Sequence, residues 1–263
     1  MAKYSKEVIE TAKRLRLIDD TLFRLVTEDI PACQEILREL LDNDGLEVIE
    51  AIPQRRLGGL NRNIIVDLLC KTSDGNYINV EVQTGDYHDD FRRTRLHASI
   101  ITAHETPKDT EFAIVPDVTV LYITEYDAAK QNLPVAVENH YIKAGNILVE
   151  VPDGETIIYA TTAINDGSSH SKLLQLFLRD DAFDEKDYPA ISARVGYFKR
   201  TEEGREDMCR AVDELSKKRE KDKTDQIIRK LLKNGVDESI IADSADVTID
   251  YVVKIKDGEL QMV

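Results

Sequence analysis

The chain has 263 residues, of which 42% are hydrophobic and 32% charged, a composition typical of a globular protein with a substantial core. Its formal net charge of −15 argues against non-specific nucleic-acid binding over the whole surface, because such binding needs Lys and Arg to neutralise phosphates. No apolar run reaches the roughly 18 residues that span a membrane, and the polar N-terminus is unlike a signal peptide. Three widely separated cysteines predict reduced thiols in a cytoplasmic protein rather than a zinc site.

The first quarter of the chain has a helical pattern that gives way to strands. Helices are predicted over residues 5–16, 20–28 and 31–41. A strand is predicted over residues 46–52. Residues 53–63 then form a turn-rich basic connector that includes Arg62.

Residues 64–83 predict two short strands joined by a tight turn at Ser73-Asp74-Gly75. A three-residue loop with Gly75 in the left-handed conformation places Asp67 directly opposite Glu81, with Cβ atoms roughly 4.5–5.5 Å apart. The alternative is a two-residue loop at Asp74-Gly75, which would place Asp67 opposite Val82.

Two carboxylates this close repel each other unless a positive charge lies between them. A divalent cation suits the position, because Mg²⁺ takes one or two protein carboxylates together with water and phosphate oxygens. A second interpretation remains open. Facing acids are common on solvated sheet faces, and a Lys or Arg from elsewhere in the chain could neutralise them.

A basic helix is predicted to follow the hairpin, opening at Asp89-Asp90 and running to about residue 104. Arg93 and His97 are four residues apart and share one face of this helix, which also carries Arg92. Arginine binds phosphate well, so a basic helix beside an acidic metal site would hold a nucleic-acid backbone. Alternatively, these arginines pair with nearby acids.

The rest of the chain alternates between strands and helices. Strands are predicted over residues 118–122, 147–151 and 157–161, the last two around a turn in a meander, and helices over 169–178 and 206–218. This order is mixed α/β rather than a repeated βαβ series.

The charged stretch 217–223 is interpreted as a linker or solvated helix between a domain over residues 1–216 and a helical tail over residues 224–263. The tail has helix-turn-helix dimensions, with Gly235 ending one helix and Thr248 capping another. It carries five basic residues against eight acidic ones, so a packing or oligomerisation module is at least as well supported as a DNA reader.

Asp67, the Gly-turn hairpin, Glu81-Val82-Gln83 and the helix RRTRLHAS (92–99) together resemble the PD-(D/E)XK nuclease superfamily. More narrowly, they resemble the PD-(D/E)XK nuclease family transposases, also called recombination-promoting nucleases. The resemblance covers nearly the whole chain, and the E-x-Q form of the last motif is typical of this branch. It implies a restriction-endonuclease-like core with a mixed sheet flanked by helices, and a small helical C-terminal tail.

The resemblance implies a DNA endonuclease that hydrolyses phosphodiester bonds with Mg²⁺, or with Mn²⁺ as a substitute, in recombination or mobile-element biology. The implied catalytic residues are Asp67, Glu81 and Gln83, the last in the position usually taken by lysine. The implied metal ligands are Asp67, Glu81, the backbone carbonyl of Val82, and Asp20 from the opening helix with Asp19 as its substitute.

The expected nucleic-acid contacts are Arg93, Arg92, Arg62 and His97. A homodimer would supply two active sites for double-strand cleavage. The alternative function is a catalytically weak or inactive nuclease relative that acts as a protein- or DNA-binding module, because Gln83 can orient groups by hydrogen bonds but cannot exchange a proton.

Overall fold

The computed structural model of the chain describes residues 3–59, 62–86, 88 and 90–258. The chain divides into two units, one formed by Glu10–Met208 and the other by the residues up to Ile9 together with those from Cys209 onward. Among the described residues, no helix combines the length and the apolar character needed to cross a membrane.

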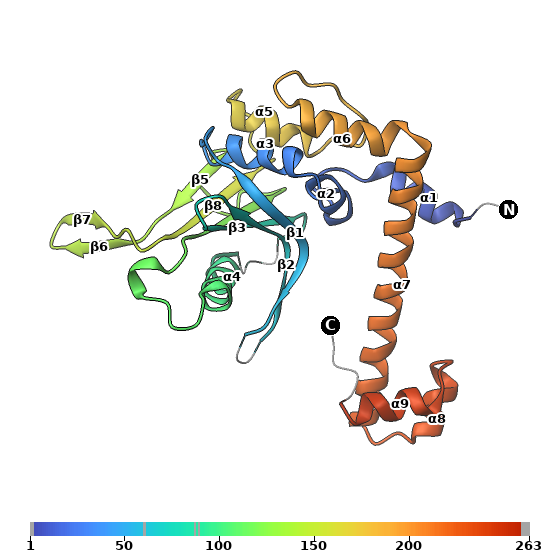
Figure 1. Ribbon diagram of the computed structural model, residues 1–263. Helices are drawn as coiled ribbons and strands as arrows, with labels where there is room; N and C mark the ends of the chain where they lie inside the picture. Colours follow the sequence, from blue (N-terminus) through green and yellow to red (C-terminus); the bar gives the residue numbers. More distant parts are fainter. Residues whose placement is uncertain (1–2, 60–61, 87, 89, 259–263) are drawn as a thin grey trace. The chain divides into compact units, whose positions relative to one another are not determined.

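A mixed six-stranded sheet forms the centre of the larger unit (Figure 1). In spatial order its strands are β1 (Val48–Leu57), β2 (Ile64–Thr72), β3 (Tyr77–Gln83), β4 (Val118–Thr124), β8 (Glu155–Thr161) and β5 (Val135–Glu138). β1, β2 and β3 are antiparallel, β3, β4 and β8 run in parallel, and β5 is antiparallel to β8. The predicted mixed α/β class with a mixed sheet is confirmed.

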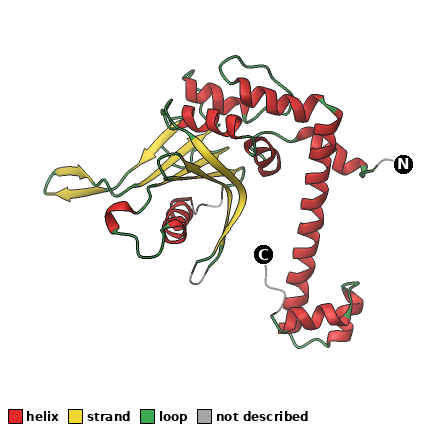
Figure 2. Ribbon diagram, viewed as in Figure 1, coloured by secondary structure: helices red, strands yellow, loops and turns green. Residues whose placement is uncertain are grey.

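Helices cover both faces of this sheet (Figures 1 and 2). They are α2 (Asp20–Thr27), α3 (Ile30–Leu40), α4 (Asp90–Glu105), α5 (Ser169–Leu176) and α6 (Pro189–Arg200). The chain also forms α1 (Lys6–Arg14) and the 3₁₀ helix η1 (Phe112–Ile114). α4 lies on one face, where its Ala98 and Ile101 belong to the same buried cluster as Val66 and Val120 of the sheet. α2, α3, α5 and α6 lie on the opposite face.

The three N-terminal helices confirm the sequence prediction, with their ends shifted by one or two residues. α3 has a side-chain cap, because Asp29 accepts a hydrogen bond from the Ala32 N–H at 3.0 Å, and Pro31 lies in its first turn. α6 was not predicted. Its signal is Pro189 at the first position, followed by buried Ile191, Val195 and Phe198 at helical spacing.

The turn between β2 and β3 has the predicted three-residue form. Gly75 has a φ of +90°, and Leu68 lies opposite Val80 in the strand pairing. A two-residue loop would shift the register by one residue and place Asp67 opposite Val82. That alternative is therefore wrong.

The first strand is longer than predicted and includes part of the basic connector. β1 continues past Ile52 and pairs with β2 as far as Leu57 opposite Ile64. Pro53 is tolerated within it because β1 is an edge strand and need not donate a hydrogen bond there. The next residue, Gln54, has a φ of +51°, where residues with a side chain are uncommon.

The predicted meander around residues 147–161 is wrong. β8 pairs in parallel with β4, while β6 (Tyr141–Ala144) and β7 (Ile147–Glu150) form a separate antiparallel ribbon. The sequence pattern marks these strands but not their partners, because parallel pairing depends on residues distant along the chain. In this β6–β7 ribbon, more than half of the surface is exposed on each of Ile142, Ile147, Leu148 and Val149.

The C-terminal unit contains most of one long helix, α7 (Glu202–Lys233). α7 is continuous, so the separately predicted helices and the charged stretch 217–223 between them form a single helix. Within it, Lys217 pairs with Asp213 one turn earlier at 2.7 Å.

Two short helices follow, α8 (Glu238–Ser244) and α9 (Ile249–Lys256). Gly235, with a φ of +75°, follows α7, and the Thr248 hydroxyl accepts a hydrogen bond from the Tyr251 N–H at the start of α9, as predicted. The small core of this part consists of Ile228, Ile241, Ala242, Val252 and Ile255. Residues 259–263 of the predicted tail lie outside the described residues.

All three cysteines are free and buried. Cys33 of α3 and Cys70 of β2 lie against each other, with 3.4 Å between their sulfur atoms. The pair therefore lies where α3 packs on the sheet. The hydrogen bond with the Cys33 thiol, followed by burial, raises the pKa of Cys70.

Gly75→Ala is expected to lower the free energy of unfolding by about 1 kcal/mol, because a side chain is strained at a φ of +90° even though no atom lies within 4 Å of the added Cβ. Thermal denaturation should show a fall in Tm of about 2–4 °C. Gly45→Ala is the matched control, since Gly45 is exposed in a turn and lies outside the left-handed region. An equal loss in both variants would contradict this role for Gly75.

Candidate metal centre

The β2–β3 hairpin brings Asp67 and Glu81 into contact. The Asp67 N–H donates to Glu81 Oε1 at 3.3 Å, and the Val82 N–H donates to Asp67 Oδ2 at 3.0 Å. Glu81 is only 6% exposed and Asp67 is partly buried. These two acids therefore share an enclosed space rather than a solvated sheet face.

A third carboxylate comes from the first residue of α2. Asp20 Oδ1 accepts a hydrogen bond from Gln54 Nε2 at 3.0 Å, and the same nitrogen is 3.5 Å from Asp67 Oδ1. Asp19, the substitute for Asp20, instead binds Arg16 at 3.1 Å between Oδ1 and Nη2. The structure thus brings Asp20, not Asp19, to the hairpin acids.

The charges of the three carboxylates act on one another. Burial, followed by the charges of Glu81 and Asp20, raises the pKa of Asp67 well above its usual range. The Val82 N–H and the Arg93 guanidinium lower the pKa of Asp67, but they offset only part of this effect. A negative charge on Asp67 is thus costly, and a cation near it would be strongly stabilising.

α4 supplies the basic side of the site. Arg93 Nη1 donates to Gln83 Oε1 at 3.3 Å, and His97 Nδ1 lies 3.2 Å from Glu81 Oε1. His97 is only 8% exposed, which leaves too little surface for direct contact with a nucleic acid. Its ring instead contacts Glu81, one of the two hairpin acids.

Two of the predicted nucleic-acid contacts are exposed. Arg92 is exposed on α4, and Arg62 is exposed in the connection between β1 and β2, next to residues 60–61, which lie outside the described residues. The predicted site residues that do come together are Asp20, Asp67, Glu81, Val82, Gln83, Arg93 and His97.

Gln54 is the site residue that the sequence did not reveal. The sequence pattern predicts a turn-rich connector over residues 53–63, which includes Gln54. Its side chain reaches the acids because β1 continues through Pro53 and Gln54 takes a left-handed backbone conformation. Glutamine rarely adopts that conformation, so the residue type at position 54 does not indicate a left-handed backbone there.

The N-terminus of α4 is held to the sheet by a buried acid. Asp90 Oδ1 accepts hydrogen bonds from the hydroxyls of Tyr122 at 3.0 Å and Tyr126 at 2.6 Å. Burial raises the pKa of both hydroxyls, and Asp90 adds to this effect, so both remain protonated donors. Tyr122 lies beside Glu81 in the pairing of β3 with β4. Asp89, the other acid predicted to open this helix, lies outside the described residues.

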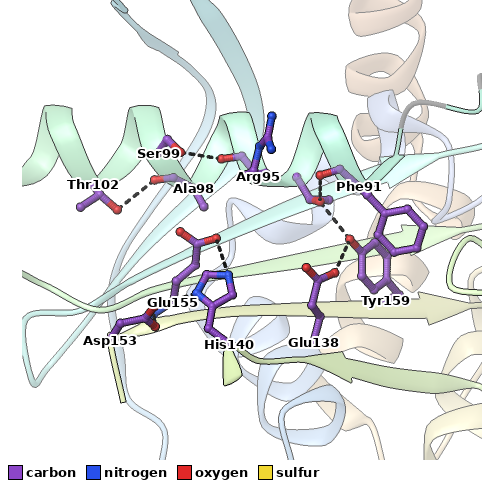
Figure 3. Close-up of polar contacts among 11 residues, drawn as sticks. Phe91, Arg95, Ala98, Ser99, Thr102, Glu138, His140, Asp153, Glu155 and Tyr159 are labelled. Carbon is purple, nitrogen blue, oxygen red and sulfur yellow. Dashed lines mark hydrogen bonds and ion pairs between the residues drawn. The ribbon is translucent and has the colours of Figure 1, made fainter. Parts of the chain in front are cut away.

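A second polar group joins α4 to β5 and β8 (Figure 3). The Tyr159 hydroxyl donates to Glu138 at 3.1 Å and lies 3.0 Å from the Thr94 hydroxyl. His140 Nδ1 is 2.6 Å from Asp153 Oδ2, and this contact raises the pKa of His140. The Thr94–Tyr159 contact joins α4 to β8 on the face of the sheet that α4 covers, and the His140–Asp153 contact joins the two ends of the β6–β7 ribbon.

The donor chemistry of the site fits a hard divalent cation. Asp20, Asp67 and Glu81 offer carboxylate oxygens, which Mg²⁺ and Mn²⁺ prefer. In the part of the chain that the structure describes, no three His, Cys, Asp or Glu side chains already form a set of metal ligands. The carboxylates are instead held by hydrogen bonds from the protein, including those of Gln54.

In comparisons with known proteins, no protein family matches the chain, and no curated protein or solved structure is significantly similar to it. The function must therefore be inferred from the site.

Asp67→Asn is expected to raise the free energy of unfolding by at least about 1 kcal/mol at neutral pH in the presence of a chelator, because it removes an unfavourable charge and keeps an acceptor for the Val82 N–H. In the wild type, the folded carboxyl keeps its proton to a higher pH than the unfolded one. Wild-type stability therefore falls as the pH rises from the ordinary Asp range to the raised pKa, and the advantage of the variant grows.

Thermal denaturation between pH 4 and pH 8 measures this difference, which should reach about 2–4 °C in Tm. Asp44→Asn is the control, since Asp44 is exposed. A Tm for Asp67→Asn that stays at or below the wild-type value over this range would contradict the repulsion described above.

Proposed function

We propose that this protein is a Mg²⁺-dependent DNA endonuclease whose larger unit is a PD-(D/E)XK-type nuclease core. The observation that carries the proposal is the meeting of Asp20, Asp67 and Glu81, where burial and then the charges of Glu81 and Asp20 raise the pKa of Asp67. The sequence resemblance to recombination-promoting nucleases supports DNA as the substrate and recombination or mobile elements as the setting.

Each residue of the site has a role in this proposal. Asp20, Asp67, Glu81 and the Val82 carbonyl would hold the ion, which, when bound, polarises the scissile phosphate and lowers the pKa of a water molecule. His97 fixes the orientation of the Glu81 carboxylate through the contact at 3.2 Å.

Arg93 supplies a charge that Gln83 lacks. Glutamine cannot carry a charge or exchange a proton, whereas arginine keeps its charge at all relevant pH values. Arg93 donates to Gln83 Oε1, and its charge also lowers the pKa of Asp67. A permanent positive charge thus lies beside the motif, where it can bind the phosphate, and the Gln83 amide is held in a fixed orientation.

The second candidate is a catalytically weak or inactive relative that binds protein or DNA. Two observations favour it: Gln83 has no proton to transfer, and the described residues contain no set of three side chains already arranged to bind a metal. The net charge of −15 would then suit a protein partner better than DNA.

A plasmid-nicking assay with Mg²⁺ or Mn²⁺ tests the proposal. The wild type should cut, and Asp67→Ala and Glu81→Ala should each lose at least about 100-fold in rate, because each removes a carboxylate that holds the ion. Asp44→Ala controls for the loss of a surface acid and should cut like the wild type.

Equal residual cutting by the wild type and both site variants would mean that the activity comes from a contaminant. The enzyme proposal would then be abandoned. Retention of DNA or protein binding by such an inactive wild type would support the second candidate.

Arg92→Ala is expected to weaken DNA binding at all sequences and to reduce the slope of log K against log salt by about one, because Arg92 is exposed on α4 and would neutralise one phosphate. Fluorescence anisotropy over a series of salt concentrations measures the slope. Arg219→Ala, an exposed arginine on α7, is the control. An unchanged slope for Arg92→Ala would place the DNA path elsewhere.

A further inference from the structure

Gln54 joins two of the three acids through one nitrogen atom. Its Nε2 donates to Asp20 Oδ1 at 3.0 Å and lies 3.5 Å from Asp67 Oδ1. Gln54 lies opposite Asp67 in the β1–β2 pairing, between the pairs Pro53–Leu68 and Arg55–Val66. Its φ of +51° costs energy for a residue with a side chain. The surrounding strands therefore hold a strained residue at the point where α2 meets the hairpin.

The amide of Gln54 is a poor match for the charge around it. It offers two hydrogens with partial positive charge, so it satisfies carboxylate oxygens without neutralising them. Asp20 and Asp67 therefore keep their mutual repulsion despite this contact. A divalent cation bound by the same two oxygens would remove the repulsion that the amide leaves in place.

The two contacts of the amide differ in strength. The contact with Asp20 has an ordinary hydrogen-bond length, whereas the contact with Asp67 is at the upper limit for a hydrogen bond. The amide can thus leave Asp67 at little cost. Gln54 is also partly exposed, so its side chain has space to move when its place is taken.

We propose that Gln54 is a positioning residue whose amide takes the place of the divalent cation between Asp20 and Asp67, and that the cation displaces it on binding. This inference rests on the proposed cation site. In the metal-free protein the amide keeps α2 beside the hairpin and limits the repulsion of the acids. Because the amide and the cation compete for the same oxygens, Gln54 weakens cation binding while it stabilises the metal-free fold.

Gln54→Met tests the competition, because methionine keeps the length of the side chain and removes the amide. Without metal, its Tm should fall by about 3 °C, since the hydrogen bonds to charged acceptors are lost. Its affinity for Mn²⁺, measured by calorimetry on the full chain, should rise about tenfold, because the cation no longer has to displace the amide. The two changes should be equal in free energy, since the amide contacts exist only in the metal-free state.

Gln54→Glu is the second variant, with a carboxylate in place of the amide. It should lower the metal-free Tm further and tighten Mn²⁺ binding at least as much. If either variant does not fold without metal, recovery of the folded state on addition of Mn²⁺ supports the inference, and no recovery overturns it. Lys130→Met is the control, because Lys130 also has a left-handed backbone, with a φ of +57°, and lies exposed in the connection between β4 and β5. It should leave Mn²⁺ affinity unchanged.

If the Gln54 variants bind Mn²⁺ with the same affinity as the wild type, or more weakly, the inference is overturned and the proposed function remains in place. Such a result would mean that Gln54 is a fixed part of the site. A wild type that binds no Mn²⁺ at millimolar concentration would overturn both the inference and the proposed cation site.

Discussion

Repulsion between carboxylates in an enclosed space is the interaction on which the rest of this structure depends. The strand register forces Asp67 and Glu81 together, and α2 adds Asp20. The surrounding polar groups reduce the cost of this arrangement without removing it, since Val82 and Gln54 donate hydrogen bonds and Arg93 contributes a charge nearby. The packing of the sheet with the helices on its two faces keeps these carboxylates together. A bound cation would stabilise the site by offsetting their repulsion.

The parts of the site that depend on neighbours along the chain could be predicted from the sequence. The position of Gly75 determines the turn, the turn determines the register, and the register places Asp67 opposite Glu81. Hydrophobic periodicity likewise located the N-terminal helices and most strands, because a buried face imposes its own spacing. These steps require no knowledge of distant residues.

The parts that depend on distant pairing could not be predicted. The partner of β8 is β4 rather than β7, and the sequence of either strand does not specify its neighbour. Gln54 reaches the site through a left-handed backbone conformation, which a glutamine in the sequence does not predict. The sequence places His97 among arginines on a basic helix, whereas in the structure α4 turns it toward the sheet, where Glu81 contacts it. In each case the decisive contact is made with residues distant along the chain, which the local sequence does not specify.

The β6–β7 ribbon has a consequence for the behaviour of the protein in solution. It exposes Ile142, Ile147, Leu148 and Val149 on two strands that pair with each other and carry free edges within the described chain. A net charge of −15 makes molecules repel one another at neutral pH, which opposes pairing of these edges. Near the isoelectric point of about 4.8 that repulsion disappears, and strand edges of this kind join copies of the chain. The loss of net charge, and not only the protonation of buried carboxylates, therefore changes how this protein behaves as the pH falls.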